Sequence, residues 1–239
     1  SQFAYIARNS VDGAGSAGIA VFSSLSDGLA PTQTVVIVDN TVTDASGNGI
    51  EHTVVGFSLA SFTEAVLIAG NSVSGAGGNG IADTETLISI PGAVTQGLAI
   101  YGNGVATAGN AGIKLTLASL NLGSMYQGVA IGRNSIGAVP SDGIEIAESL
   151  VFFSGGAIAN MYVANNIVGS AGGDGIDVAL AASNLSSLSR GVAIDANSLG
   201  TAAGDGIVLA DTIASITGAV VESASVSYNR LTSAVGTGI

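Results

Sequence analysis

Acidic residues recur at one fixed position in the sequence and are the first candidates for chemistry. Asp142, Asp174 and Asp205 each stand two residues before an isoleucine, and Asn48 and Asn79 hold the equivalent position elsewhere. If these positions stack about 4.8 Å apart, repulsion would raise the pKa of at least one carboxylate or attract a cation such as Ca²⁺. Asx residues also suit tight turns that face water. We therefore predict a solvated turn here, with no catalytic residue, metal ligand or cofactor site.

The other ionisable residues show no complete catalytic set in the sequence. His52 is the only histidine, and without a recurring partner we expect it to be an exposed strand residue. We expect the pairs Asp174/Asp177 and Glu145/Glu148 to stand in water as well. The five basic residues are Arg8, Lys114, Arg133, Arg190 and Arg230, and their spacing links none of them to the acidic column. Because no acid, base and cation come together, we predict that the chain is not an enzyme.

One asparagine recurs along the whole chain, and it defines the repeat that must position these residues. An isoleucine or valine stands three residues before it, a valine, isoleucine or leucine two residues after it, and a Gly-Ile pair ends ten residues after it. The spacing is 31 or 32 residues throughout, which predicts a solenoid of about eight coils. The recurring residues are Asn9, Asn40, Asn71, Asn103, Asn134, Asn166, Asn197 and Asn229.

The repeat unit favours short strands joined by tight turns. Apolar residues alternate in 113–117 and 144–146, as a half-buried strand requires. In the turn at 170–175 we expect the glycines to supply positive φ. The more variable segments, such as 84–96, are expected to add one or two strands, with a short helix as the alternative at 178–185.

Stacking of identical positions gives the asparagine column its predicted role. If each coil lies on the next, the amides can form a ladder at a corner, bonding neighbouring coils and the turn backbone. The fold class that follows is an all-β parallel β-helix, with residues 1–239 as one solenoid domain that is uncapped at both ends. In that arrangement Ile100, Ile131, Val163 and Ile194 should form one internal column.

Other repeat folds fit the sequence less well. Ankyrin and tetratricopeptide repeats need long amphipathic helices, and leucine-rich repeats, which share the pattern seen in 129–136, are shorter and lack the Gly-rich turn. The unit resembles the right-handed parallel β-helix repeat of the pectate-lyase-like superfamily over essentially the whole chain. That resemblance implies a scaffold shared by carbohydrate-active enzymes, adhesins, tailspikes and surface proteins. The lyases among them place Lys or Arg beside clustered carboxylates, a set that this sequence does not display.

Composition excludes several classes of function. Only 9% of residues are charged, against about 25% in a typical soluble domain. The net charge of −12 argues against nucleic-acid binding, which needs a basic surface. No run of about 18 apolar residues occurs, so we expect no membrane insertion. The absence of cysteine excludes disulfides and thiolate metal sites.

The function that we favour is inferred from the outer surface and the two ends of the predicted solenoid, and not from a catalytic or binding site. Outward positions are largely Gly, Ala, Ser and Thr, and the sequence runs from a repeat strand at 3–7 to Gly238 and Ile239 without a polar capping repeat. We expect head-to-tail association with other copies of the chain, as a structural subunit of an extracellular fibre, sheath or surface layer. The composition is similar to that of prokaryotic cell-envelope sheath proteins. The alternatives are a carbohydrate-binding or carbohydrate-cleaving β-helix domain, with polysaccharide as partner, and a fragment of an adhesin.

Overall fold

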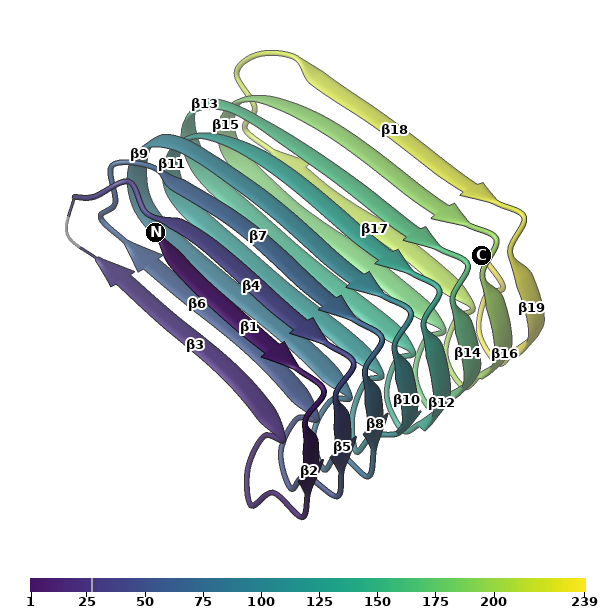
Figure 1. Cartoon of the computed structure of the whole chain (residues 1–239). Coiled ribbons are helices and arrows are strands. Elements are labelled where there is room, and N and C mark those ends of the chain that lie inside the picture. Colours follow the sequence, from purple (N-terminus) through teal and green to yellow (C-terminus); the bar gives the residue numbers. More distant parts are fainter. Residues whose placement is uncertain (27) are drawn as a thin grey trace.

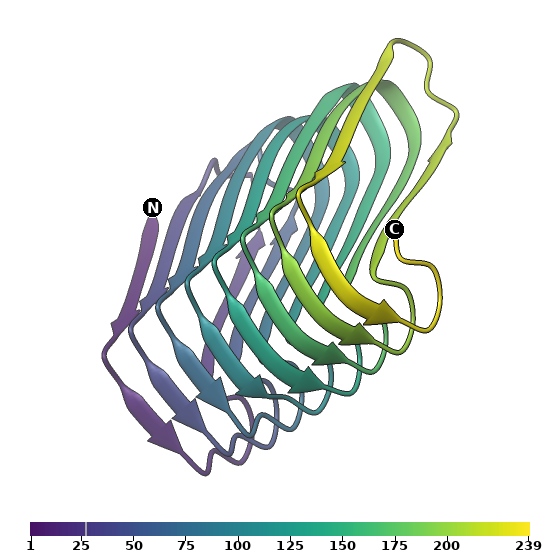
Figure 2. The same cartoon turned by 90° about the vertical axis from the view of Figure 1, so that its right-hand side faces the viewer.

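The chain folds into the parallel β-solenoid that the repeat predicts, with about seven turns rather than eight (Figure 1). This computed structural model describes residues 1–26 and 28–239. Strands stack coil upon coil along one axis, and two views at right angles show the same regular order from the N-terminal to the C-terminal coil (Figures 1 and 2). The described residues form strands and turns only, and they include no helix with the length and apolarity that crossing a bilayer requires.

Each turn consists of two long walls and one short wall. Wall 1, which precedes the ladder asparagine, contains β1 (Gln2–Ala7), β4 (Thr32–Val38), β7 (Phe62–Ala69) and β18 (Val220–Ser227). Wall 2, which follows the Gly-Ile pair, contains β3 (Ile19–Ser26), β6 (Ile50–Phe57) and β17 (Ile207–Ala214). Four longer strands bend and run through both walls: β9 (Ile81–Tyr101), β11 (Ile113–Gly132), β13 (Ile144–Ala164) and β15 (Ile176–Asp195).

The short wall is an eight-stranded parallel sheet that lies on the same side of every coil. Its strands are β2 (Ser10–Asp12), β5 (Thr41–Thr43), β8 (Ser72–Ser74), β10 (Gly104–Thr107), β12 (Ser135–Val139), β14 (Ile167–Ala171), β16 (Ser198–Ala202) and β19 (Arg230–Ala234). The last described coil contains only β18 and β19, so eight asparagine-marked repeats give about seven full turns.

Identical repeat positions stack directly on one another, as the sequence predicts. In wall 1, Ile100 pairs with Ile131, Ile131 with Val163, and Val163 with Ile194, all in parallel register. All four side chains are fully buried. The inward positions alternate with outward ones, so each strand directs one apolar face toward the core.

The short helix considered for residues 178–185 is wrong, because β15 passes through that segment as a strand. Val178, Leu180 and Ala182 point inward at every second position, which is the period of a strand rather than of a helix. Asn184, in a left-handed conformation with φ 56°, turns the strand from wall 2 into wall 1.

Positive φ occurs at the corners and not in the Gly-rich turn at 170–175, which corrects the role expected for those glycines. The residue before the ladder asparagine is left-handed in every coil, with φ between 53° and 65°, and only Gly70 and Gly102 are glycines there. Gly172 serves a different purpose. A Cβ on that residue would lie 2.2 Å from the carbonyl oxygen of Pro140 in the preceding coil. These glycines therefore permit close stacking of the turns.

The asparagine column forms the predicted ladder, with consecutive members linked from Asn9 to Asn229. Asn134 is typical: its backbone N–H and its Nδ2 both donate to Oδ1 of Asn166 at 3.0 Å, and Nδ2 also donates to the carbonyl oxygen of Ile100 at 3.0 Å. Its own Oδ1 accepts from N and Nδ2 of Asn103. Only 1% of Asn134 is exposed, so each bond is shielded from water.

Replacing Asn134 with alanine should lower the free energy of unfolding by about 1–3 kcal/mol, because the bonding groups of Asn103 and Asn166 would stay buried without partners. Denaturant unfolding followed by circular dichroism measures this change. The control is Ser135→Ala, which alters an exposed neighbour and should stay within about 0.5 kcal/mol of the wild type. Equal losses in the two variants would contradict a stabilising ladder.

Candidate functional site

The interior holds two apolar clusters with a layer of polar side chains between them. One cluster adjoins the short wall and includes Ile37 and Ile50, and the other adjoins the opposite bend and includes Leu59 and Phe62. The polar side chains come from strand positions between these clusters on both walls. Buried polar groups are costly unless they find partners, so this layer is the natural place to look for function.

On wall 1 the layer is a single column that runs the length of the solenoid. Its members stand seven residues before each ladder asparagine and pair in register from coil to coil. We name it the polar column, and it consists of Gln2, Gln33, Glu64, Gln96, Gln127, Ala159, Arg190 and Glu222. Ala159 alone lacks a polar side chain, and it divides the column into an N-terminal and a C-terminal part.

On wall 2 the facing side chains stand twelve or fourteen residues after the ladder asparagine. His52 and Asp83 occupy the first of these positions, and Glu85, Glu148 and Asp211 occupy the second. In the remaining coils the same positions hold apolar residues such as Leu115 and Leu117, or a serine in the first coil. The polar side chains of wall 2 therefore gather into an N-terminal group, with His52, Asp83 and Glu85, and a C-terminal group, with Glu148 and Asp211.

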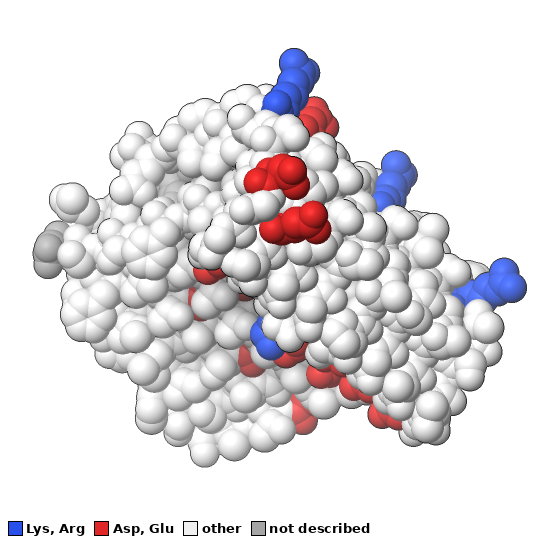
Figure 3. Space-filling view, turned by 90° about the horizontal axis from the view of Figure 1, so that it is seen from below, with Lys and Arg blue, Asp and Glu red and all other residues white. Residues whose placement is uncertain are grey.

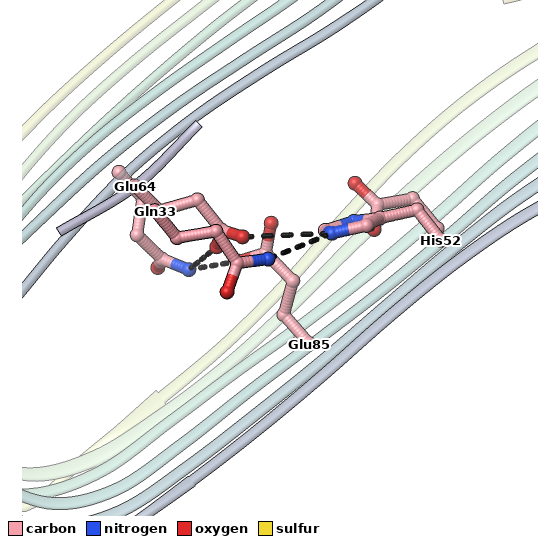
Figure 4. A network of polar contacts seen from close by, with 6 residues as sticks. Gln33, His52, Glu64 and Glu85 are labelled. Atoms are coloured by element: carbon pink, nitrogen blue, oxygen red, sulfur yellow. Dashed lines mark hydrogen bonds and ion pairs between the residues drawn. The ribbon is translucent and has the colours of Figure 1, made fainter. Parts of the chain in front are cut away.

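The N-terminal group, the histidine cluster, consists of Gln33, His52, Glu64, Asp83, Glu85 and Gln96. Figure 4 shows Gln33 and Glu64 reaching across the interior toward His52. Nδ1 of His52 lies 2.8 Å from Oδ1 of Asp83, and Nε2 lies 3.6 Å from Oε1 of Glu64. Nε2 of Gln96 donates to Oε2 of Glu85 and, at 3.5 Å, to Oε2 of Glu64. The expectation of an exposed His52 is wrong, because 0% of the residue is accessible.

Protonation in the histidine cluster is governed by burial. Burial raises the pKa of Glu64 to about 7, with His52 opposing the shift, and raises the pKa of Glu85 well above its usual value. For His52, burial lowers the pKa, but the hydrogen bond and charge of Asp83 and the charge of Glu64 outweigh it, so the net shift is upward. The cluster thus holds protons that free side chains would release at neutral pH.

The C-terminal group consists of Glu148, Arg190 and Asp211. Nη1 of Arg190 donates to both carboxylate oxygens of Asp211 at 2.5 Å, and 25% of the Asp211 side chain is exposed. Glu148 is 3% exposed, which contradicts the expectation that the Glu145/Glu148 pair stands in water. Burial raises the pKa of Glu148 to about 7, while the charge of Arg190 lowers it and that of Asp211 raises it.

The acidic column singled out in the sequence lies in the turns and acts as a second ladder. Oδ1 of Asp142 accepts the backbone N–H of Asp174, and Oδ1 of Asp174 accepts that of Asp205, both at 2.6 Å. Asn48 and Asn79 make the same type of bond in earlier coils. These residues are half-buried rather than fully solvated. These residues lie in turns, as predicted. One side-chain oxygen of each linked residue accepts a backbone N–H of a neighbouring coil.

Acidic side chains follow a narrow row on an otherwise largely uncharged face of the solenoid (Figure 3). Burial and the neighbouring charges of Asp142 and Asp174 raise the pKa of Asp177 to about 6, and burial raises that of Asp142. Lys114 bonds Oε1 of Glu145 at 2.7 Å and partly offsets the shift of Asp142.

Of the other bases, Arg133 lies over the ring of Tyr101 at 5.3 Å, while Arg8 and Arg230 are exposed. Arg190 is buried in the core, away from the surface row. Among the described residues, the structure therefore brings one base, Lys114, to the acidic column.

The polar layer was missed in the sequence although a signal for it exists. Seven of the eight positions that stand seven residues before the ladder asparagine carry Gln, Glu or Arg. In 33–37 that residue shares the inward phase with Val35 and Ile37, so the period of the strand places it inside. A column of long polar residues in the buried phase of an apolar strand predicts an internal polar layer.

Comparison with known proteins gives no family to which the site could be referred: no family model, no curated protein and no solved structure matches the chain.

Glu148→Gln should remove part of the pH dependence of stability. Because the folded state raises the pKa of Glu148 from 4.5 to about 7, its protonated form contributes stability below pH 4.5, and this contribution is lost as pH rises through 7. The wild type should therefore lose about 3 kcal/mol more than Glu148→Gln between pH 4.5 and 8. Unfolding in denaturant at several pH values measures it.

Asn160→Ala, an exposed and uncharged change on the same strand, is the control and should keep the wild-type profile. A Glu148→Gln profile parallel to that of the wild type would show that folding does not raise the pKa of Glu148.

Proposed function

We propose that the chain is a structural, self-assembling β-solenoid subunit of an extracellular fibre, sheath or surface layer, in which copies stack end to end. In this role the chain catalyses no reaction. The observation that carries the proposal is the polarity of the asparagine ladder, which leaves complementary groups at its two ends.

Every bond in the ladder runs in one direction, from the donors of one asparagine to Oδ1 of the asparagine in the next coil. At the N-terminal coil, no described residue donates to Oδ1 of Asn9. At the C-terminal coil, the backbone N–H of Asn229 has no such acceptor among the described residues, and its Nδ2 donates only to the carbonyl of Ile194. Asn229 of one copy and Asn9 of another therefore match as donor and acceptor.

The strands at both ends support the same contact. Within the part of the chain that the structure describes, β1 pairs only with β4 and β18 only with β15, so each presents a row of unpaired backbone groups. Inward side chains are also less covered there. Ile6 is only half-buried although Ile37, its counterpart one coil further on, is fully buried. Stacking β1 of one copy on β18 of another would cover this apolar edge.

Such a contact joins two different surfaces, so it is heterologous and generates an open filament or a closed ring. The low charge content would let neighbouring assemblies pack side by side with little repulsion. Few charges combined with abundant Gly, Ala, Ser and Val are shared with prokaryotic cell-envelope sheath proteins, and this likeness supports a place at the cell surface.

Lysines at both ends should block assembly. Ala4 of β1 and Ala224 of β18 belong to the same inward column, so Ala4→Lys combined with Ala224→Lys would bring two like charges together at the junction. We expect the wild type to form filaments or rings in electron micrographs and the double variant to remain monomeric by light scattering.

Ser135→Lys combined with Asn160→Lys is the matched control, since it adds the same charge at exposed positions in central coils and should still assemble. Assembly of the end variant to the same extent as this control, or a wild type that stays monomeric at high concentration, would overturn the proposal.

A second test concerns catalysis. We expect no hydrolysis or elimination of acidic polysaccharides, because Oδ1 of Asp142, Asp174 and Asp205 accepts backbone N–H groups and a single lysine is nearby. Product release from defined oligosaccharides is measured by chromatography. Turnover that disappears in the triple Asp→Asn variant at these positions would establish the enzyme instead.

A further inference from the structure

The histidine cluster buries more carboxyl groups than its own basic group can pair with. Glu64, Asp83 and Glu85 are each at most 3% exposed, and they surround one imidazole, His52. No described Lys or Arg forms an ion pair with any of them. Carboxylates removed from water without a cation are strongly disfavoured, so this part of the core calls for a positive charge.

The ligand atoms converge on one point between the walls. One nitrogen of His52 and one carboxylate oxygen each of Glu64 and Glu85 all lie within 4.8 Å of one another (Figure 4). The distance between Nε2 of His52 and Oε1 of Glu64 is 3.6 Å. A tetrahedral ion with bonds of about 2.0–2.1 Å has ligands about 3.4 Å apart. A small first-row ion therefore fits after slight movement of flexible side chains.

The imidazole is held as a metal-binding histidine would be. Nδ1 lies 2.8 Å from Oδ1 of Asp83, so that its proton is donated to a carboxylate and Nε2 is directed toward Glu64 and Glu85. Metal-bound histidines almost always donate their second ring N–H in this way, which fixes the tautomer and the ring orientation. Asp83 is thus a positioning residue, while His52 supplies the ligand.

Two buried oxygens of the cluster lack hydrogen-bond partners. Oε1 of Glu64 and Oε1 of Gln33 have no hydrogen-bond partner among the described residues, and both residues are at least 97% buried. Nε2 of Gln33 lies 3.4 Å from Nε2 of His52. Rotation of the Gln33 side-chain amide by about 180° brings its oxygen to the place of Nε2, where it can serve as a fourth donor.

We propose that His52, Glu64 and Glu85 bind one divalent transition-metal ion, such as Zn²⁺ or Mn²⁺, inside the solenoid, with Asp83 orienting the histidine and Gln33 as fourth ligand. The ligands come from β6, β7 and β9, so the ion ties the two walls of successive coils together. The site is closed on all sides, which makes the ion structural, and it enters as the coils fold. This inference is independent of end-to-end assembly.

The test begins with the wild-type chain unfolded and refolded with EDTA, with Zn²⁺, with Mn²⁺ or with Ca²⁺, and then desalted. We expect one retained Zn²⁺ or Mn²⁺ per chain by elemental mass spectrometry, a higher melting temperature than in EDTA, and no retained Ca²⁺, because an imidazole ligand suits transition metals. Refolding with Co²⁺ should give visible d–d absorption. Wild-type chain that refolds and retains neither Zn²⁺ nor Mn²⁺ overturns the proposal.

Glu85→Gln should retain less than a tenth of the wild-type metal, and Asp83→Asn should weaken affinity by about 10–100-fold. The matched control is Glu148→Gln, which changes a buried glutamate at the same repeat position two coils further on and should retain one ion. Equal retention by Glu85→Gln and the wild type, or equal loss in Glu148→Gln, would place the metal elsewhere. If Glu85→Gln does not refold, the Co²⁺ spectra of the wild type and Asp83→Asn decide, since unchanged spectra and affinity contradict the site.

Discussion

The rest of this structure depends on stacking of like positions along one axis. In the central coils, most backbone N–H and C=O groups of the walls are bonded to the coil before or after them, so a residue lies about one strand spacing from its counterparts in both neighbouring coils. Each stacked position is therefore restricted to residue types that can lie directly on a residue of the same type. Isoleucine satisfies this by packing, asparagine by pairing a donor with an acceptor, and glycine by letting carbonyl oxygens approach closely.

Charge is the case that stacking tolerates least, and the polar layer shows how the chain arranges it. The polar column interleaves amides with acids, so Gln96 lies between Glu64 and Gln127 and donates to the acid while accepting from the amide. On wall 2, acids at the same repeat position are separated by leucines, as Leu117 separates Glu85 from Glu148. Within the polar layer, acids at the same repeat position are thus kept apart along the axis, unlike the acids of the turn column. Opposite charges meet across the interior, as His52 meets Glu64.

Most of the fold could be predicted from the sequence because the repeat is strict. The repeat length predicts the coils, and the recurring asparagine predicts the ladder. The constant offset of Ile100 and Ile131 from that asparagine predicts that their side chains stack in one column. The site could not be predicted in the same way. The sequence predicts an exposed His52 because Asp83 occupies the same offset in one neighbouring coil only, and because Glu64 stands at another offset and meets His52 only when the two walls face each other. Contacts within a column follow from periodicity, whereas contacts between columns depend on the shape of the coil.

Ala159 interrupts the polar column of the interior. A methyl group stands where Gln127 and Arg190 have long polar side chains, so the axial chain of hydrogen-bonding groups is interrupted at that coil. Wall 1 therefore carries two separate polar segments, and a substitution in one of them alters no side-chain hydrogen bond of the other along this column.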